Sequence, residues 1–364
     1  MIAKLTQLTP FRICIQIQGI PQTVFYEFTE DSAIDLANVN LTNFLVLAAF
    51  PFAMKKGLDL EIPGTIDAQL ARNLEQYSFA WHQYRPNLFK CPVRVIADEY
   101  KESCPMPGAD YIAAYSGGFD SSYTLVDLAT KNKCSPWPRV SNAVMIDGFG
   151  FNLAKKQQYI DAFNRGKIFC ADLGITLMGV RTNWAKIVVW YQIFHTMGIA
   201  AIQNLYSARH AGGYIGLDFT YSEEFILGPW GNMAMLDRIL SSSNFPIIPH
   251  GGEASRIEKI CSLHEAEQDL NITVCNASER SSQNCGLCEK CIRTMLAYRC
   301  QNLQVSDQQF SSRLNIDMVS SIEITKRTQW IFYRKMEHLW QDRSDPFLKA
   351  IQRVIKQAED TTDF

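Results

Sequence analysis

The amino-acid sequence predicts an α/β protein built on a doubly wound, mainly parallel sheet. From Asp110 onward, short apolar runs alternate with stretches of helical spacing, a rhythm typical of parallel strands with helices on both faces. A turn of small residues, Ser-Gly-Gly-Phe-Asp-Ser-Ser, follows the first of these runs and precedes a helical pattern. At 364 residues, the chain also has room for more than one domain.

The segment before Asp110 predicts an N-terminal accessory domain of α+β type at residues 1–105. Two helical patterns span 40–57 and 68–84. A turn-rich stretch at 103–110 predicts the linker that follows. Apolar or alternating runs predict strands at 11–18, 23–30, 58–64 and 91–97.

The central domain is expected at residues 106–302. Ligands of doubly wound sheets bind beyond the carboxyl ends of the strands, so Asp147 and the segment 228–232 are expected near a ligand. The remaining residues, 303–364, predict a helical C-terminal extension. Its interleaved aromatic side chains favour internal packing or a homodimer face over a cofactor site. The strands of the central domain are expected at 111–115, 142–148, 175–182, 214–220, 246–250 and 271–275.

Composition is that of an ordinary globular protein, with 47% apolar and 20% charged residues. The net charge of −2 argues against a generally basic surface for nucleic acid. No apolar run reaches membrane-spanning length, and the N-terminus lacks the apolar region and cleavage site of a signal peptide. The odd number of cysteines, 11, does not suggest a disulfide framework. We therefore expect a cytoplasmic protein.

The turn at 116–122 has the features of an anion site. Gly117 and Gly118 let backbone N–H groups approach a ligand closely, and the following helix offers unpaired donors at its N-terminus. Hydroxyls of Ser116, Ser121 and Ser122 add donors, which favours a phosphate group. The turn differs from the GxxxxGK[ST] loop and from the GxGxxG fingerprint. A plain Gly-Gly turn is the alternative.

Four cysteines have the spacing of metal ligands. The two-residue gaps let neighbouring thiolates reach one ion, and Gly286 permits a tight turn. Four thiolates fit a closed, structural, tetrahedral Zn²⁺ site. An iron–sulfur cluster and one face of a helix are the alternatives. The candidate ligands are Cys275, Cys285, Cys288 and Cys291.

The turn 116–122 resembles the PP-loop of the N-type ATP pyrophosphatases, which cleave ATP between its α and β phosphates. Together with the four cysteines, it resembles the QueC family of 7-cyano-7-deazaguanine synthases over about residues 108–302. The stretch 250–260 is similar to the family's later phosphate-side segment. The stretch 147–158 departs from the family's pattern, and so does the length of chain before and after the resemblance.

The resemblance implies an adenine nucleotide α-hydrolase-like fold and an ATP-pyrophosphate-forming ligase. It implies ATP and Mg²⁺ as cofactors, besides the Zn²⁺ site. Ser116, Asp120, Arg256 and Lys259 would act in catalysis. The ATP-binding residues would be Ser116, Gly117, Gly118, Phe119, Asp120, Ser121, Ser122 and Asp147.

The substrate implied by the resemblance is 7-carboxy-7-deazaguanine, which would be adenylated and then attacked by an amine. Extended relatives occur in bacterial antiviral gene clusters, so we expect a protein amine as acceptor, held by the N-terminal domain. One alternative is conventional nitrile synthesis with ammonia for modified tRNA bases. Another is a degenerate PP-loop scaffold, which the intact loop disfavours. The sequence leaves the acceptor, the partner and the base-recognition residues open.

Overall fold

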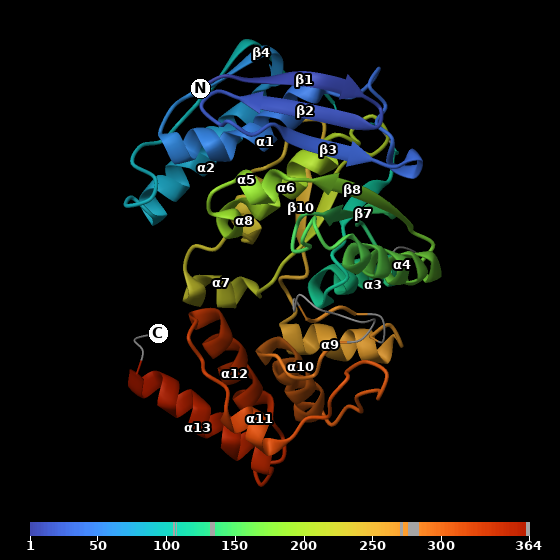
Figure 1. Cartoon of the computed structure of the whole chain (residues 1–364), viewed down its shortest axis with the longest axis vertical. Coiled ribbons are helices and arrows are strands. Elements are labelled where there is room, and N and C mark those ends of the chain that lie inside the picture. Colours follow the sequence, from blue (N-terminus) through green and yellow to red (C-terminus); the bar gives the residue numbers. More distant parts are fainter. Residues whose placement is uncertain (105, 107, 132–134, 270–271, 276–283, 362–364) are drawn as a thin grey trace.

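The described residues form one eight-stranded sheet that extends from the N-terminal strands into the middle of the chain (Figure 1). This computed structural model describes residues 1–364 except 105, 107, 132–134, 270–271, 276–283 and 362–364. In order across the sheet, the strands are β1 (Ala3–Thr9), β2 (Arg12–Ile17), β3 (Val24–Phe28), β8 (Thr176–Thr182), β7 (Val140–Asp147), β6 (Tyr111–Ala114), β9 (Gly213–Gly216) and β10 (Ile247–His250).

The five strands from β8 to β10 run parallel, which confirms the predicted fold class. The strand order reverses between β6 and β9, the kind of place where such sheets bind ligands. Alternate residues of β7 face opposite sides. Val144 belongs to the apolar cluster that includes α6 (Tyr191–Asn204), and Met145 to the cluster that includes α3 (Phe119–Lys131) and α4 (Lys156–Asp172). Both faces are therefore covered by helices.

The N-terminal segment extends this sheet. Strand β3 pairs antiparallel with β8, and α1 (Leu41–Lys56) packs on α6 within one apolar cluster. The structure confirms both predicted N-terminal helices, the second of which is α2 (Ala68–Tyr84). Strands β4 (Leu60–Asp67) and β5 (Val95–Lys101) form a separate pair, and β1 was not predicted. The division of the chain at residue 105 remains a prediction, and sheet and core continue across it.

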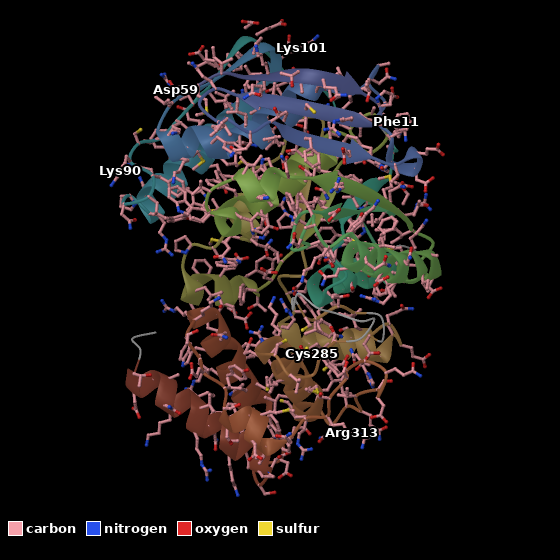
Figure 2. All side chains as sticks on the ribbon, in the orientation of Figure 1. Phe11, Asp59, Lys90, Lys101, Cys285 and Arg313 are labelled. Atoms are coloured by element: carbon pink, nitrogen blue, oxygen red, sulfur yellow. The ribbon has the colours of Figure 1, made fainter. Side chains whose placement is uncertain are left out.

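Helices make up the end of the molecule opposite the N-terminal strands, and they confirm the predicted helical tail (Figure 1). Cys285 lies between this helical end and the sheet, whereas Phe11 and Lys101 lie at the other end (Figure 2). No helix in the described ranges has the length and apolar character to cross a membrane. The helices of this end are α9 (Arg256–Glu265), α10 (Glu289–Cys300), α11 (Ile316–Ser320), α12 (Arg327–Leu339) and α13 (Pro346–Thr361).

The strand expected at 271–275 is wrong for its described residues, because Ile272–Cys275 forms no strand. Asn271 lies outside the described residues. The backbone N–H groups of this segment bind elsewhere: that of Thr273 donates to the carbonyl of Gly117 at 2.7 Å, and that of Val274 donates to Oδ1 of Asn284 at 2.8 Å. The apolar alternation therefore marks a buried connecting segment beside the turn after β6.

We predict that Phe44→Ala lowers the free energy of unfolding of the whole chain by about 3–5 kcal/mol, the usual cost of emptying a buried phenylalanine site. Phe44 of α1 is fully buried and its ring lies 5.0 Å from that of Tyr26 on β3. Chemical denaturation measures the change, with Phe79→Ala in the exposed part of α2 as the control. Two separate transitions, of which only one shifts, would instead show that residues 1–105 fold on their own.

Candidate functional site

The turn after β6 forms a tight loop that opens onto a cavity. We call Ser116–Phe119 the glycine loop. Gly117 has φ 76°, in the left-handed region that favours glycine. The N–H of Ser116 donates to Oγ of Ser121 at 3.1 Å, and that hydroxyl donates to the carbonyl of Gly118 at 3.1 Å. These bonds fold the loop over the start of α3, whose first amides have no partner within the helix.

Asp120 connects the start of α3 to α9. Its carboxylate accepts a hydrogen bond from Nε of Arg256 at 3.0 Å and one from Nζ of Lys259 at 3.2 Å. The Lys259 side chain is fully buried and also donates to the carbonyl of Leu217. Arg256 lines the cavity beside the glycine loop, whereas Lys259 lies behind it. Of the two cations expected from the sequence, only Arg256 can therefore reach a ligand there.

The main cavity has a volume of about 450 Å³ and lies between the sheet and the helical end. The glycine loop, α4, α9, α10 and α12 contribute to its walls, together with the segment 272–275. Its charged lining residues are Arg165, Arg256, Lys290, Arg293 and Lys335 with Asp120, Asp161, Asp218 and Glu223.

A second cavity of about 180 Å³ shares Ser116, Asp120 and Asp218 with the main one, so the two adjoin. It lies at the carboxyl ends of β6, β7 and β9, and α6 covers it. Burial lowers the pKa of His195 in its wall, so this imidazole is neutral at pH 7. Aromatic and aliphatic side chains together with a set of polar groups are typical of a small-molecule site. The aromatic residues that line it are Phe149, Phe151, Tyr115 and Tyr191.

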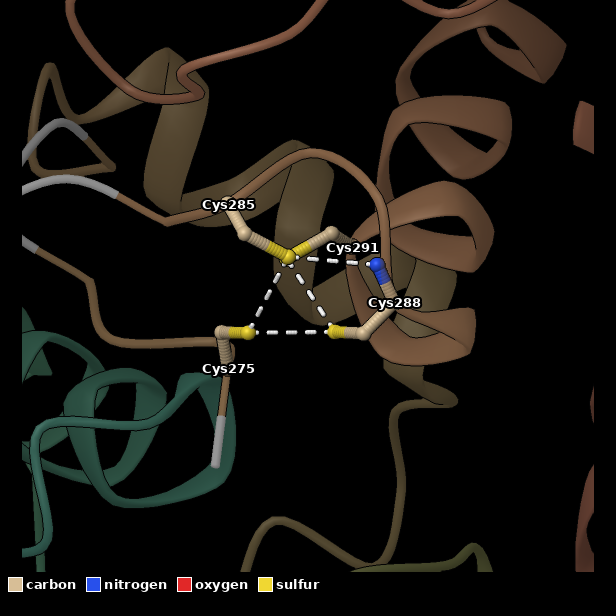
Figure 3. A group of neighbouring side chains, drawn as sticks. All are labelled: Cys275, Cys285, Cys288 and Cys291. Atoms are coloured by element: carbon tan, nitrogen blue, oxygen red, sulfur yellow. Dashed lines mark hydrogen bonds between the residues drawn. The ribbon is translucent and has the colours of Figure 1, made fainter. Parts of the chain in front are cut away.

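The four predicted cysteine ligands converge at the start of α10 (Figure 3). The Sγ atom of Cys275 lies 3.0 Å from that of Cys288 and 3.5 Å from that of Cys285. Cys291 lies 3.8 Å from Cys285 and 3.5 Å from Cys288. Gly286 has φ 69°, and a side chain there would meet the carbonyl of Ser312. The four sulfurs can therefore bind one metal ion.

Three residues expected to bind nucleotide line neither cavity: Gly117, Ser122 and Asp147. Asp147 ends β7, but its carboxylate lies 3.3 Å from Nε of Arg181, and burial raises its pKa. Ser122 is fully buried in α3. By contrast, the segment 228–232 does contribute Trp230 to the main cavity and Asn232 to the second.

Sequence reasoning missed the cations of α10 and α12 that line the main cavity. Lys290 and Arg293 are three residues apart, a spacing that places both on one face of α10. The spacing of the four cysteines indicates a metal site in this stretch, but it does not indicate which way the neighbouring cations face. The tail contributes Lys335, which no motif marks.

Comparisons with known proteins give no family assignment. No family model matches the chain, and no curated protein matches it. Among solved structures, the U34-tRNA thiolase NcsA from Methanococcus maripaludis with its [4Fe-4S] cluster is similar at 14% identity, over 77% of this chain and 88% of that one. The TM-score is 0.34, a likeness too small to carry an argument.

We predict that Asp120→Asn lowers the free energy of unfolding by about 3–5 kcal/mol, because it leaves the buried ammonium of Lys259 without its counter-charge. Adding Lys259→Met should restore part of the loss, since the double variant buries no charge at this position. Urea denaturation measures both effects. Asp161→Asn, at a carboxylate of the same cavity that accepts from Gln157, is the control. A single variant as stable as the wild type would contradict the structural role of this pair.

Proposed function

We propose that the chain is an ATP-dependent ligase that splits ATP into AMP and pyrophosphate while it adenylates a carboxylate. One observation carries the proposal: the glycine loop, with Gly117 in the left-handed region, presents the N-terminus of α3 to a cavity that Arg256 also lines. Backbone N–H groups at a helix N-terminus are a ready phosphate site. The resemblance of this loop to the PP-loop supports cleavage between the α and β phosphates.

The residues around the glycine loop would have different roles in the reaction, according to where they lie. The amides of Gly117, Gly118 and Phe119 would hold the leaving pyrophosphate, and Arg256 would neutralise charge that develops on it. Lys259 would act through Asp120, whose carboxylate orients the Arg256 guanidinium.

A magnesium ion bound with the nucleotide would lower the charge on the phosphates. Both Asp120 and Asp218 line the two cavities, but Asp218 fits such an ion better, because its one ion pair among the described residues is a 4.0 Å contact with Arg256. Asp120 already accepts hydrogen bonds from Arg256 and Lys259. Asp218 would then hold the ion, and Asp120 would position Arg256.

We infer that the substrate is 7-carboxy-7-deazaguanine, from the sequence resemblance and from the second cavity, which is lined by aromatic side chains and adjoins the glycine loop. One carboxylate oxygen would attack the α phosphorus and displace pyrophosphate, giving an acyl-adenylate. An amine nitrogen would then attack the carbonyl carbon, lose a proton and displace AMP, so that an amide forms.

A protein amine is the proposed acceptor, and ammonia is the alternative. The extra length of the chain before residue 106 supports a partner protein, in the setting of a bacterial antiviral system. No described residue of 1–105 lines either cavity, so a partner held there would have to extend its amine to the site. The mass of the product distinguishes the two acceptors.

The test is incubation of the full chain with ATP, Mg²⁺ and 7-carboxy-7-deazaguanine, with and without ammonium. We expect AMP and pyrophosphate as products. Ser116→Ala should slow their formation about 100-fold, the usual loss when one donor to a developing charge is removed. Ser320→Ala, at an exposed position of α11, is the control. ADP and phosphate as main products, or an unchanged rate for the Ser116 variant, would contradict the proposal.

We also propose that the four cysteines hold one structural Zn²⁺ ion. Thiolates about 2.3 Å from a tetrahedral zinc ion lie about 3.8 Å from one another, and the sulfurs here are 3.5 Å, 3.5 Å and 3.8 Å apart in three pairs and 3.0 Å apart in the pair of Cys275 and Cys288. A cubane iron–sulfur cluster would hold its four thiolates further apart, because each binds a different iron. The ion would fix the segment 272–275 to the start of α10.

We expect elemental analysis to find about one zinc per chain, with little iron or sulfide. Cys288→Ser should lose most of the metal and unfold at lower temperature, because binding of a structural ion contributes to folding. Cys91→Ser, at an exposed cysteine far from the site in the sequence, should keep both. Stoichiometric iron and sulfide with an absorption band in the visible range would contradict the zinc assignment.

A further inference from the structure

One face of helix α12 lines the main cavity. The residues are Thr328, Ile331, Phe332 and Lys335. Their spacing of three, four and seven residues from the first places them in one row along the helix. This helix belongs to the tail at 303–364, outside the part of the chain that carries the PP-loop resemblance. The tail therefore contributes a wall to the proposed nucleotide site.

Contacts with α10 fix how α12 faces the cavity. The hydroxyl of Tyr333, a buried residue, donates to Oε1 of Glu289 at 3.0 Å. The guanidinium of Arg293 lies over the ring of Phe332, 4.9 Å from its centroid. Met336 is fully buried on the same side of the helix. These contacts fix the orientation of α12, so that the side chain of Lys335 lies at the cavity.

The charged side chains that α10 and α12 present to the cavity are all positive, and one of them, Arg293, has its Nε 3.4 Å from a carboxylate oxygen of Glu289. The residues of α10 and α12 that line the cavity include Lys290, Arg293 and Lys335, and none of these lining residues is acidic. Lys335 is half-buried and forms no salt bridge within the described part of the chain. Cations that share a cavity repel one another, and an anion between them removes that cost. The wall therefore favours a multiply charged anion.

We propose that Lys335 and the α10 cations bind the β and γ phosphates of ATP, and then the leaving pyrophosphate. The inference rests on the proposed function and extends it to the tail. The glycine loop would contact these phosphates through backbone N–H groups, while the α10–α12 wall would supply the charge. Phe332 would act as a positioning residue for Arg293. A carboxylate with a single charge would gain less from three cations than a pyrophosphate does.

The experiment compares binding of inorganic pyrophosphate and of AMP to the full chain by isothermal titration calorimetry, with Mg²⁺ present. Lys335→Gln should weaken pyrophosphate binding about tenfold, the worth of one charge-assisted hydrogen bond. Its affinity for AMP should not change, because AMP lacks both phosphates. Lys335→Arg keeps the charge and should restore most of the affinity for pyrophosphate.

Arg334→Gln is the matched control. Arg334 is the neighbouring residue on α12, exposed, and paired with Glu337 rather than directed to the cavity. Its pyrophosphate affinity should equal that of the wild type. Equal losses of AMP and pyrophosphate binding in Lys335→Gln, or no loss of either, would overturn the subsite.

These titrations, together with the assay of AMP formation from ATP, separate this inference from the proposed function. A wild-type chain that forms AMP from ATP, but whose Lys335→Gln variant binds pyrophosphate normally, would overturn the subsite and leave the ligase activity. A chain that needs Lys335 for pyrophosphate but never forms AMP would support the subsite and contradict the ligase.

Discussion

The arrangement of the site depends on one buried ammonium group. Lys259 is fully inaccessible to solvent, and a charge in that position is stable only with a counter-charge and hydrogen-bond acceptors. Asp120 and the carbonyl of Leu217 supply them, so the start of α3, the end of β9 and helix α9 must meet at one point. The same geometry leaves Arg256 beside the glycine loop. A charge that lines neither cavity thus determines where the cavity-lining charge of Arg256 lies.

A second connection joins the glycine loop to the helical end. Thr273 donates its N–H to the carbonyl of Gly117, and Cys275 follows two residues later in the cysteine cluster. Movement of α10 would therefore be transmitted to the loop through a short, buried segment. This explains how a site at the carboxyl ends of parallel strands can have a wall built from helices late in the chain. These two connections hold the sheet and the helical end together on either side of the cavity.

The sequence predicted the parts whose signal is local. Helix 68–84 follows from its apolar spacing, and the structure adds a cap, because the side chain of Asp67 accepts a hydrogen bond from the N–H of Leu70. The cysteine cluster follows from spacing alone.

The sequence could not predict features that depend on distant parts of the chain. The prediction of a strand at 271–275 was wrong because its N–H groups bind Gly117 and Asn284, which are tertiary contacts. Asp147 sits at the predicted strand end, yet its orientation depends on Arg181 of a neighbouring strand. The position of Lys335 at the cavity could not be predicted, because the sequence does not show which elements pack against each face of its helix.

The place of the N-terminal segment limits what it can contribute to chemistry. Strand β3 covers the edge of β8 and α1 covers α6, so this segment completes the sheet and its core on the side away from the helical end (Figure 1). Because β3 already pairs with β8, no strand of another protein can pair with that edge of β8. The strand at this end of the sheet is β1. Because α1 is buried against α6, the N-terminal segment contributes to the stability of the fold, whether or not it also binds a partner. If this segment binds a partner, the binding surface and the cavity are separate in space. The partner would then have to reach from the N-terminal segment to the carboxyl ends of the central strands, where the cavity lies.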